Sequence, residues 1–174
     1  MMRNIDVSEG IDNNPLGSFQ WMVVVLCALL LIVDGYDVFV AGTVLPTLIA
    51  EWGLTKPQAG ALQAWALFGM MFGALIFGPL ADRIGRKKGI TISFLLFTVS
   101  TLLTGLSSSP DQFKAFRFVA GLGCGGLMPN AVALMNEYAP KRLRGTMVAL
   151  MFSGYSVGGM VAAGLGIGLI PHYG

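Results

Sequence analysis

The sequence has 174 residues, of which 55% are apolar and only 11% are charged. Soluble domains usually carry about a quarter charged residues, so this composition excludes an ordinary water-soluble fold. The net charge of +2 is small and is divided among short clusters, so nucleic acid is not an expected partner. Cys27 and Cys124 lie in apolar runs without the spacing of a metal site, and they are expected to be packing residues. We expect neither a metal nor a cofactor.

Five stretches are long and apolar enough to cross a bilayer, which requires roughly 20 such residues per helix. The polar segment 1–19 precedes them and lacks a signal-peptide cleavage site, so the first span is expected to be retained. Residues 20–174 are expected to form one transmembrane domain. The fold class is predicted to be an all-α membrane protein with helices at approximately 20–45, 58–81, 89–107, 113–135 and 146–170.

The connections between these spans are short and differ in charge. The first is expected to run from Pro46 to Pro57. The second and fourth lie on the side of the N-terminus and hold Arg83, Arg86, Lys87, Lys88, Lys141, Arg142 and Arg144. The opposite side holds Lys56 and Lys114. Because short cytoplasmic loops carry the excess of Lys and Arg, the N-terminus is predicted to be cytoplasmic. Since only the four residues from Pro171 to Gly174 follow the fifth span, the chain is expected to be truncated before a sixth helix.

Three charged residues fall well inside the predicted spans, whereas Lys114 stands at the start of the fourth. Asp34 and Asp37 are three positions apart, so both carboxylates lie on one face of the first helix. Each of these acids, like Arg117, costs about 2.5–3.5 kcal/mol at a helix centre on insertion scales. Either an ion pair fixes the helix register, or the residues handle protons and substrate directly. A carboxyl group that alternates between wet and dry surroundings can load and release a proton. Arg117 keeps its proton, so it fits as a substrate anchor or as the partner of an acid.

Other polar residues in the spans are candidates for substrate contact. Tyr36, Gln63 and Asn130 could donate or accept hydrogen bonds, although single polar residues in membrane helices also serve as links between helices. The sequence has a single histidine, His172, and lacks the spacing typical of a nucleophile and its base, so it indicates no enzyme active site. The chain is therefore not expected to be an enzyme.

The segment after the second span has the most specific pattern. It contains Gly78, Asp82, Arg83, Gly85, Arg86, Lys87 and Lys88. Asp82 can pair with a nearby arginine, and Gly85 permits a tight turn. A charged latch that forms in one conformation and breaks in another is expected here. The alternative is that the basic residues serve only to anchor this side in the cytoplasm.

This segment resembles the signature G-x-x-x-D-R-x-G-R-R/K-R/K of the major facilitator superfamily, and every fixed position is matched. The stretch Asp34-Gly35-Tyr36-Asp37 is similar to the D-G-x-D motif of the aromatic acid:proton symporter family. Arg117 and the glycines that follow it are similar to the helix-four pattern of that family. The resemblance implies a fold of two six-helix halves with substrate bound between them, of which this chain supplies five helices.

The resemblance implies proton-coupled uptake of benzoate-type aromatic acids across a bacterial inner membrane. Asp34 and Asp37 would handle protons, and Arg117 would hold the substrate carboxylate with Tyr36, Gln63 and Asn130 nearby. The expected partners are the substrate, protons, the lipid bilayer and the missing C-terminal half. The alternatives are a symporter of a sugar or another organic acid, and a membrane sensor or assembly subunit that does not transport.

Overall fold

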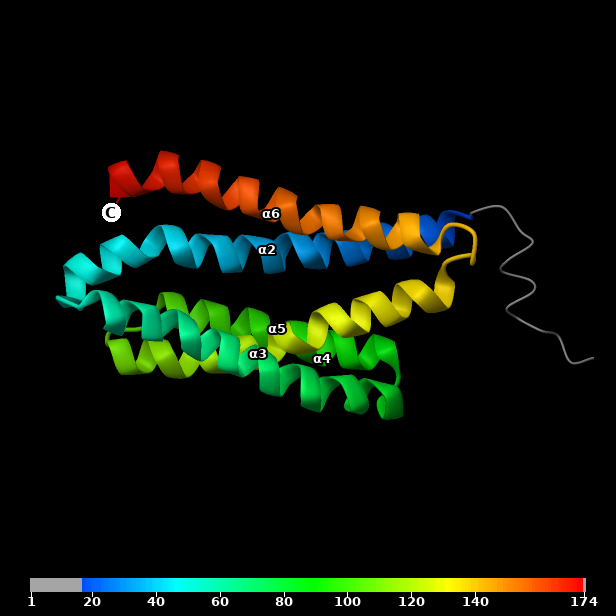
Figure 1. Cartoon of the computed structure of the whole chain (residues 1–174), viewed down its shortest axis with the longest axis horizontal. Helices are drawn as coiled ribbons and strands as arrows, with labels where there is room; N and C mark the ends of the chain where they lie inside the picture. Colours follow the sequence, from blue (N-terminus) through cyan, green and yellow to red (C-terminus); the bar gives the residue numbers. More distant parts are fainter. Residues whose placement is uncertain (1–16, 174) are drawn as a thin grey trace, which may run out of the picture.

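The computed structural model describes residues 17–173, with side chains up to residue 166, and consists of long helices joined by short turns (Figure 1). Within these residues, five helices are long and apolar enough to span a membrane. This confirms the predicted all-α membrane fold. The helices are α2 (Ser18–Trp52), α3 (Lys56–Ile84), α4 (Arg86–Gly105), α5 (Pro110–Tyr138) and α6 (Arg144–Tyr173).

The helices are longer than the apolar stretches, and the first connection does not begin at Pro46. Helix α2 continues through Pro46 to Trp52. A proline removes a single backbone donor, whereas leaving the helix inside a bilayer would expose several unpaired backbone groups. The helix ends where Gly53 adopts the left-handed conformation, with φ +60°. Thr55 then caps α3, its backbone N–H donating to Gln58 Oε1 at 2.9 Å.

The second connection is also shorter than expected, because only Gly85 lies outside a helix between α3 and α4. Its φ of +96° is open to glycine and strained for residues with a Cβ atom. The segment predicted to be a gating loop is therefore a sharp corner between two helix ends. Asp82 and Arg83 belong to the last turn of α3, and Arg86 begins α4.

Four of the five helices form two close parallel pairs, α3/α5 and α2/α6, that run in opposite directions (Figure 1), and α4 packs against α5. In the α3/α5 pair, a Cβ atom on Gly73 would collide with the carbonyl of Leu122. In the α2/α6 pair, a Cβ atom on Gly158 would collide with the carbonyl of Ile32. Small residues therefore let both pairs approach to backbone contact, as is usual in membranes. The opposite directions of the pairs agree with an inverted repeat.

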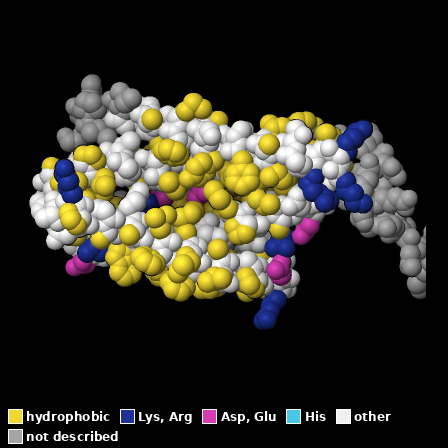
Figure 2. Space-filling model, in the orientation of Figure 1, with side chains coloured by type: hydrophobic (Ala, Val, Ile, Leu, Met, Phe, Trp, Pro, Cys, Tyr) yellow, Lys and Arg dark blue, Asp and Glu magenta, His cyan; other side chains and the backbone are white. Residues whose placement is uncertain are grey.

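The surface separates into an apolar middle and charged ends. Figure 2 shows hydrophobic side chains over the middle of the bundle and Lys and Arg side chains gathered mainly at one end. Large apolar residues such as Leu75, Leu102 and Met160 are about two-thirds exposed, as expected for a surface that faces lipid. The turn at Gly85 and the α5–α6 connection lie at the same end (Figure 1). We call it the basic end.

Candidate functional site

A buried ion pair connects α2 and α5. Arg117 Nη1 lies 2.6 Å from Asp37 Oδ2, and the two residues are 6% and 7% exposed. The guanidinium also lies over the Phe113 ring, with Cζ 5.7 Å from the ring centroid. Asp37 Oδ1 and Arg117 Nε have no hydrogen-bond partner among the described residues. The pair is therefore held by one strong contact and keeps unused hydrogen-bonding capacity.

Asp34 lies one helical turn before Asp37 and is 1% exposed. The Cys124 thiol donates to Asp34 Oδ1 at 2.6 Å, and Oδ2 has no partner within the described part of the chain. The prediction that Cys124 only packs is thus incomplete. Its position offered one clue, because seven residues separate Arg117 from Cys124 and place both on one face of α5.

A small cavity of about 40 Å³ borders the ion pair. It is lined by Asp37, Arg117, Gln63 and Cys124 together with apolar side chains of α2, α3 and α5. The structure thus places Gln63 beside the buried charges. A residue that contacts the substrate is expected to lie there. Ligand pockets usually measure about 300–1,000 Å³, so this space alone is too small for an aromatic acid.

The structure does not bring Asn130 to this cluster. Thirteen residues separate it from Arg117 along α5, a distance of about 20 Å at the helical rise. Its side chain is fully buried, and Nδ2 donates to the carbonyls of Gly126 at 2.7 Å and Phe77 at 3.2 Å. Tyr36 stays on α2 near the charges, half-buried, with its backbone against Gly158 of α6.

Arg86 links three helix ends at the basic end. It contacts Asp82 Oδ1 at 2.6 Å, Asn130 Oδ1 at 3.1 Å and Glu137 Oε1 at 3.2 Å. We call these four residues the Arg86 cluster. Its arginine holds α4 to both α3 and α5, so it is well placed for a latch. Glu137 was missed, although its position seven residues after Asn130 puts both on one face of α5.

The remaining residues of the signature have simpler surroundings. Arg83, Lys87 and Lys88 are exposed at the basic end. A Cβ atom on Gly78 would meet nothing within 4 Å, so the structure described here does not explain why this position is glycine.

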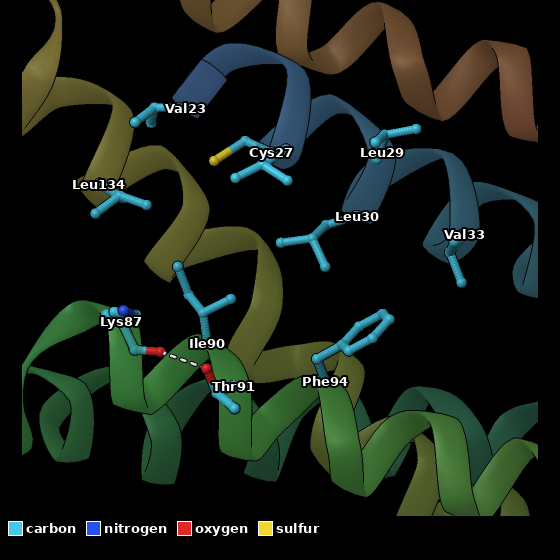
Figure 3. A pocket seen from close by; sticks show the side chains of 11 residues that line it. Val23, Cys27, Leu29, Leu30, Val33, Lys87, Ile90, Thr91, Phe94 and Leu134 are labelled. Atoms are coloured by element: carbon cyan, nitrogen blue, oxygen red, sulfur yellow. Dashed lines mark hydrogen bonds between the residues drawn. The ribbon is translucent and has the colours of Figure 1, made fainter. Parts of the chain in front are cut away.

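A larger groove of about 330 Å³ lies between α2, α4 and α5 (Figure 3). Its walls are mainly aliphatic and aromatic, with Leu30 and Val33 of α2 opposite Phe94 of α4. Lys87 stands at one end, where its carbonyl accepts a hydrogen bond from Thr91 Oγ1 at 2.9 Å. None of the predicted substrate residues lines this groove, so we place the candidate site at the buried ion pair.

Two proteins of known function match nearly the whole of this chain. The sequence is 49% identical to a benzoate transport protein of Acinetobacter baylyi, over the whole of this chain and 38% of that protein. It is 39% identical to the 4-hydroxybenzoate transporter PcaK of the same organism, over 98% of this chain and 37% of that protein. The chain therefore spans less than two-fifths of the length of these relatives.

The fold is also found among solved structures. A bacterial homologue of the human lysosomal transporter Spinster superposes with a TM-score of 0.76 at 24% identity, over 89% of this chain and 33% of that one. The family model described as Major Facilitator Superfamily matches residues 27–174. Members of this family are membrane transporters rather than enzymes. The chain belongs to the major facilitator superfamily.

Proposed function

We propose that this chain forms the N-terminal five helices of a transporter that imports aromatic carboxylic acids together with protons. The observation that carries the proposal is the Asp37–Arg117 ion pair, a carboxylate and a guanidinium buried together on two adjacent helices. The benzoate and 4-hydroxybenzoate transporters that resemble this chain support a carboxylate as the substrate group.

Arg117 suits the role of substrate anchor. A guanidinium keeps its charge and offers several donors in a planar fork, so it can bind a second carboxylate. Its Nε atom has no partner among the described residues. Gln63 lines the same cavity and could donate to the substrate. Tyr36 is near enough along α2 to contribute a ring or a hydroxyl group if the cavity widens.

Asp37 can couple the substrate to a proton. While it is ionised, Asp37 occupies Arg117 through Oδ2. When Asp37 takes a proton its attraction to the guanidinium weakens, and Arg117 becomes available to the carboxylate of the substrate. Substrate and proton would then favour each other's binding, as symport requires. The cavity of about 40 Å³ would have to widen, and we assign the rest of the pocket to the C-terminal half.

The Arg86 cluster is our proposed gate. Its contacts join the ends of α3, α4 and α5, so a rocking motion could break and remake them as one unit. Asn130 belongs to this gate and not to the substrate pocket. Gly85 supplies the corner, and Gly78 with exposed Arg83, Lys87 and Lys88 completes the segment.

We place the basic end in the cytoplasm and the protein in a bacterial inner membrane. The support is the excess of Lys and Arg at this end, which short cytoplasmic connections usually carry. With this orientation α2 and α6 run outward and α3 and α5 run inward. The Asp37–Arg117 pair then lies between the two surfaces.

The test is uptake of labelled benzoate and 4-hydroxybenzoate by cells expressing the complete reading frame that contains this sequence, with and without a protonophore. We expect uptake that the protonophore abolishes. Asp37→Asn keeps the size of the side chain but cannot exchange a proton, so it should lose accumulation while the protein still reaches the membrane. Asp111→Asn is the matched control, because Asp111 is exposed and its ion pair among the described residues is with nearby Lys114.

Two results would contradict the proposal. If neither acid enters although the protein is inserted, the aromatic substrate is wrong, and competition with sugars and dicarboxylates would identify another symporter. If Asp37→Asn retains the full activity of the protein whatever that activity is, Asp37 has no coupling role. A sensor or assembly subunit would behave in this second way.

A further inference from the structure

An aromatic pair joins α2 and α6 beside the buried charges. The Phe39 and Tyr155 rings lie edge to face, with centroids 6.0 Å apart and planes inclined at 61°. Phe39 follows Asp37 by two residues on α2. The backbone carbonyl of Tyr155 packs against Gly35, which lies between Asp34 and Asp37 in the sequence. The proposed anchor, coupling acid and gate use neither ring.

Two glycines determine where these rings lie. A Cβ atom on Gly35 would collide with the Tyr155 backbone, so glycine here lets α6 approach α2 directly beside the acids. A Cβ atom on Gly159 would come within 2.9 Å of the Phe39 ring, so this glycine leaves the space that the ring occupies. Phe39 is nevertheless 48% exposed, and Tyr155 is half-buried. The pair therefore has a defined position and still presents ring surface to a ligand.

The ring pair and the ion pair border the same region. Tyr155 lies within electrostatic range of Asp34 and Cys124. Cys124 also lines the cavity that contains Arg117. Seven residues of α5 separate Arg117 from Cys124, which corresponds to about 10 Å at the helical rise. A 4-hydroxybenzoate ion with a hydrogen bond of roughly 2.8 Å at each end has a similar length.

We propose that Phe39 and Tyr155 form the ring subsite of the transporter, and that the Tyr155 hydroxyl recognises a hydroxyl group para to the carboxylate of the substrate. The inference deepens the proposed function and rests on it, because it takes Arg117 as the anchor of the carboxylate. The Phe39 ring contacts the rings of benzoate and 4-hydroxybenzoate alike. The Tyr155 hydroxyl can donate and accept, so it pairs with the phenol group of 4-hydroxybenzoate.

The charges around the cavity give the substrate one direction. Arg117 is the only cation among the described residues that line the cavity, so the carboxylate of the substrate is attracted to that end. The tyrosine end lies near Asp34, whose carboxyl group offers a second carboxylate no attraction. A neutral hydroxyl group meets no such difficulty. The para position of the ring therefore lies at Tyr155 when the carboxylate is bound to Arg117.

The test compares uptake of labelled benzoate and 4-hydroxybenzoate by cells that express the complete reading frame containing this sequence. Tyr155→Phe removes one oxygen and keeps the ring. The concentration of 4-hydroxybenzoate that gives half-maximal uptake should therefore rise about 5- to 10-fold, whereas the value for benzoate should change less than about two-fold. Phe39→Leu removes a ring contact that both acids share, so it should raise both values by roughly 2- to 10-fold.

A second aromatic pair supplies the matched controls. Phe19 and Tyr138 also lie edge to face, with centroids 5.4 Å apart, but they stand at the basic end (Figure 1). Tyr138→Phe and Phe19→Leu should leave the uptake of both acids as in the wild type. A matched ligand is 3-hydroxybenzoate, because its hydroxyl group is displaced by one ring position. Its uptake should change less in Tyr155→Phe than that of 4-hydroxybenzoate.

The position of the Phe39 ring can be tested without removing the ring. Gly159→Ala places a methyl group against it, so uptake of both acids should weaken as in Phe39→Leu. Gly164→Ala is the control on the same helix, because its Cβ atom would meet nothing within 4 Å.

The outcomes separate this inference from the proposed function. Equal changes for both acids in Tyr155→Phe, or uptake of benzoate alone by the wild type, would overturn the role of the Tyr155 hydroxyl and leave aromatic acid transport in place. Normal uptake of both acids in Phe39→Leu and Tyr155→Phe would remove the pair from the site. A wild type that is inserted in the membrane but takes up neither acid would contradict the proposed function, and the ring subsite with it.

Discussion

At the residue scale, the ion pair between α2 and α5 should be costly to break from one side. Arg117→Met leaves Asp37 buried and unpaired, and breaking a buried pair in this way costs about 3–5 kcal/mol of unfolding free energy. Chemical unfolding of the purified protein measures this loss.

The double variant Asp37→Leu/Arg117→Met serves as the control for this prediction. With both charges gone no uncompensated charge remains, so most of the lost stability should return. An equal loss in the single and double variants would show that Arg117 stabilises the bundle through packing on Phe113 rather than through its charge.

At the residue scale, some residues of the site could be predicted from the sequence and others could not. Asp34, Asp37 and Arg117 could be singled out because charges inside a membrane are costly wherever the helices pack. Cys124 and Glu137 could not be chosen in the same way, because their contacts depend on which helices are neighbours. Asn130 was selected as a polar residue inside a span, but its depth along α5 places it with Arg86.

At the element scale, backbone contact between α3 and α5 should not tolerate a methyl group. Gly73→Ala would place Cβ against the carbonyl of Leu122, so the helices must separate. Overpacking of this kind costs about 1–3 kcal/mol. Gly60→Ala is the matched control on the same helix, because its Cβ would meet nothing within 4 Å. The control should be neutral or stabilising by up to about 1 kcal/mol, since alanine favours helix.

Unfolding free energies of the two variants test whether Gly73→Ala destabilises the protein while Gly60→Ala does not. A loss of similar size in both would mean that helix propensity, not close approach, determines their effect. The glycine spacing indicated close packing from the sequence but could not identify the partner helix. The helix ends were also hard to predict, because Pro46 interrupts the sequence pattern without interrupting the helix.

For the whole molecule, the charge asymmetry should determine which end lies in the cytoplasm. Green fluorescent protein folds to a fluorescent form in the cytoplasm but not after export through the bacterial secretion channel. Inserted into the α5–α6 connection after Lys141 it should therefore fluoresce, whereas inserted into the α4–α5 connection after Ser108 it should not. These connections lie at opposite ends of the bundle (Figure 1).

Removal of the basic side chains tests whether positive charge determines the orientation in the membrane. Exposed Arg83, Lys87 and Lys88 can be replaced by Gln while the Arg86 cluster stays intact. If positive charge holds this end in the cytoplasm, the fluorescence of the Lys141 insertion should fall in the variant, because fewer molecules insert in the assigned direction. Fluorescence from the Ser108 insertion in the unmodified chain would reverse the orientation. With the reversed orientation the Asp37–Arg117 pair would still lie between the two membrane surfaces, but α2 would run inward and α5 outward.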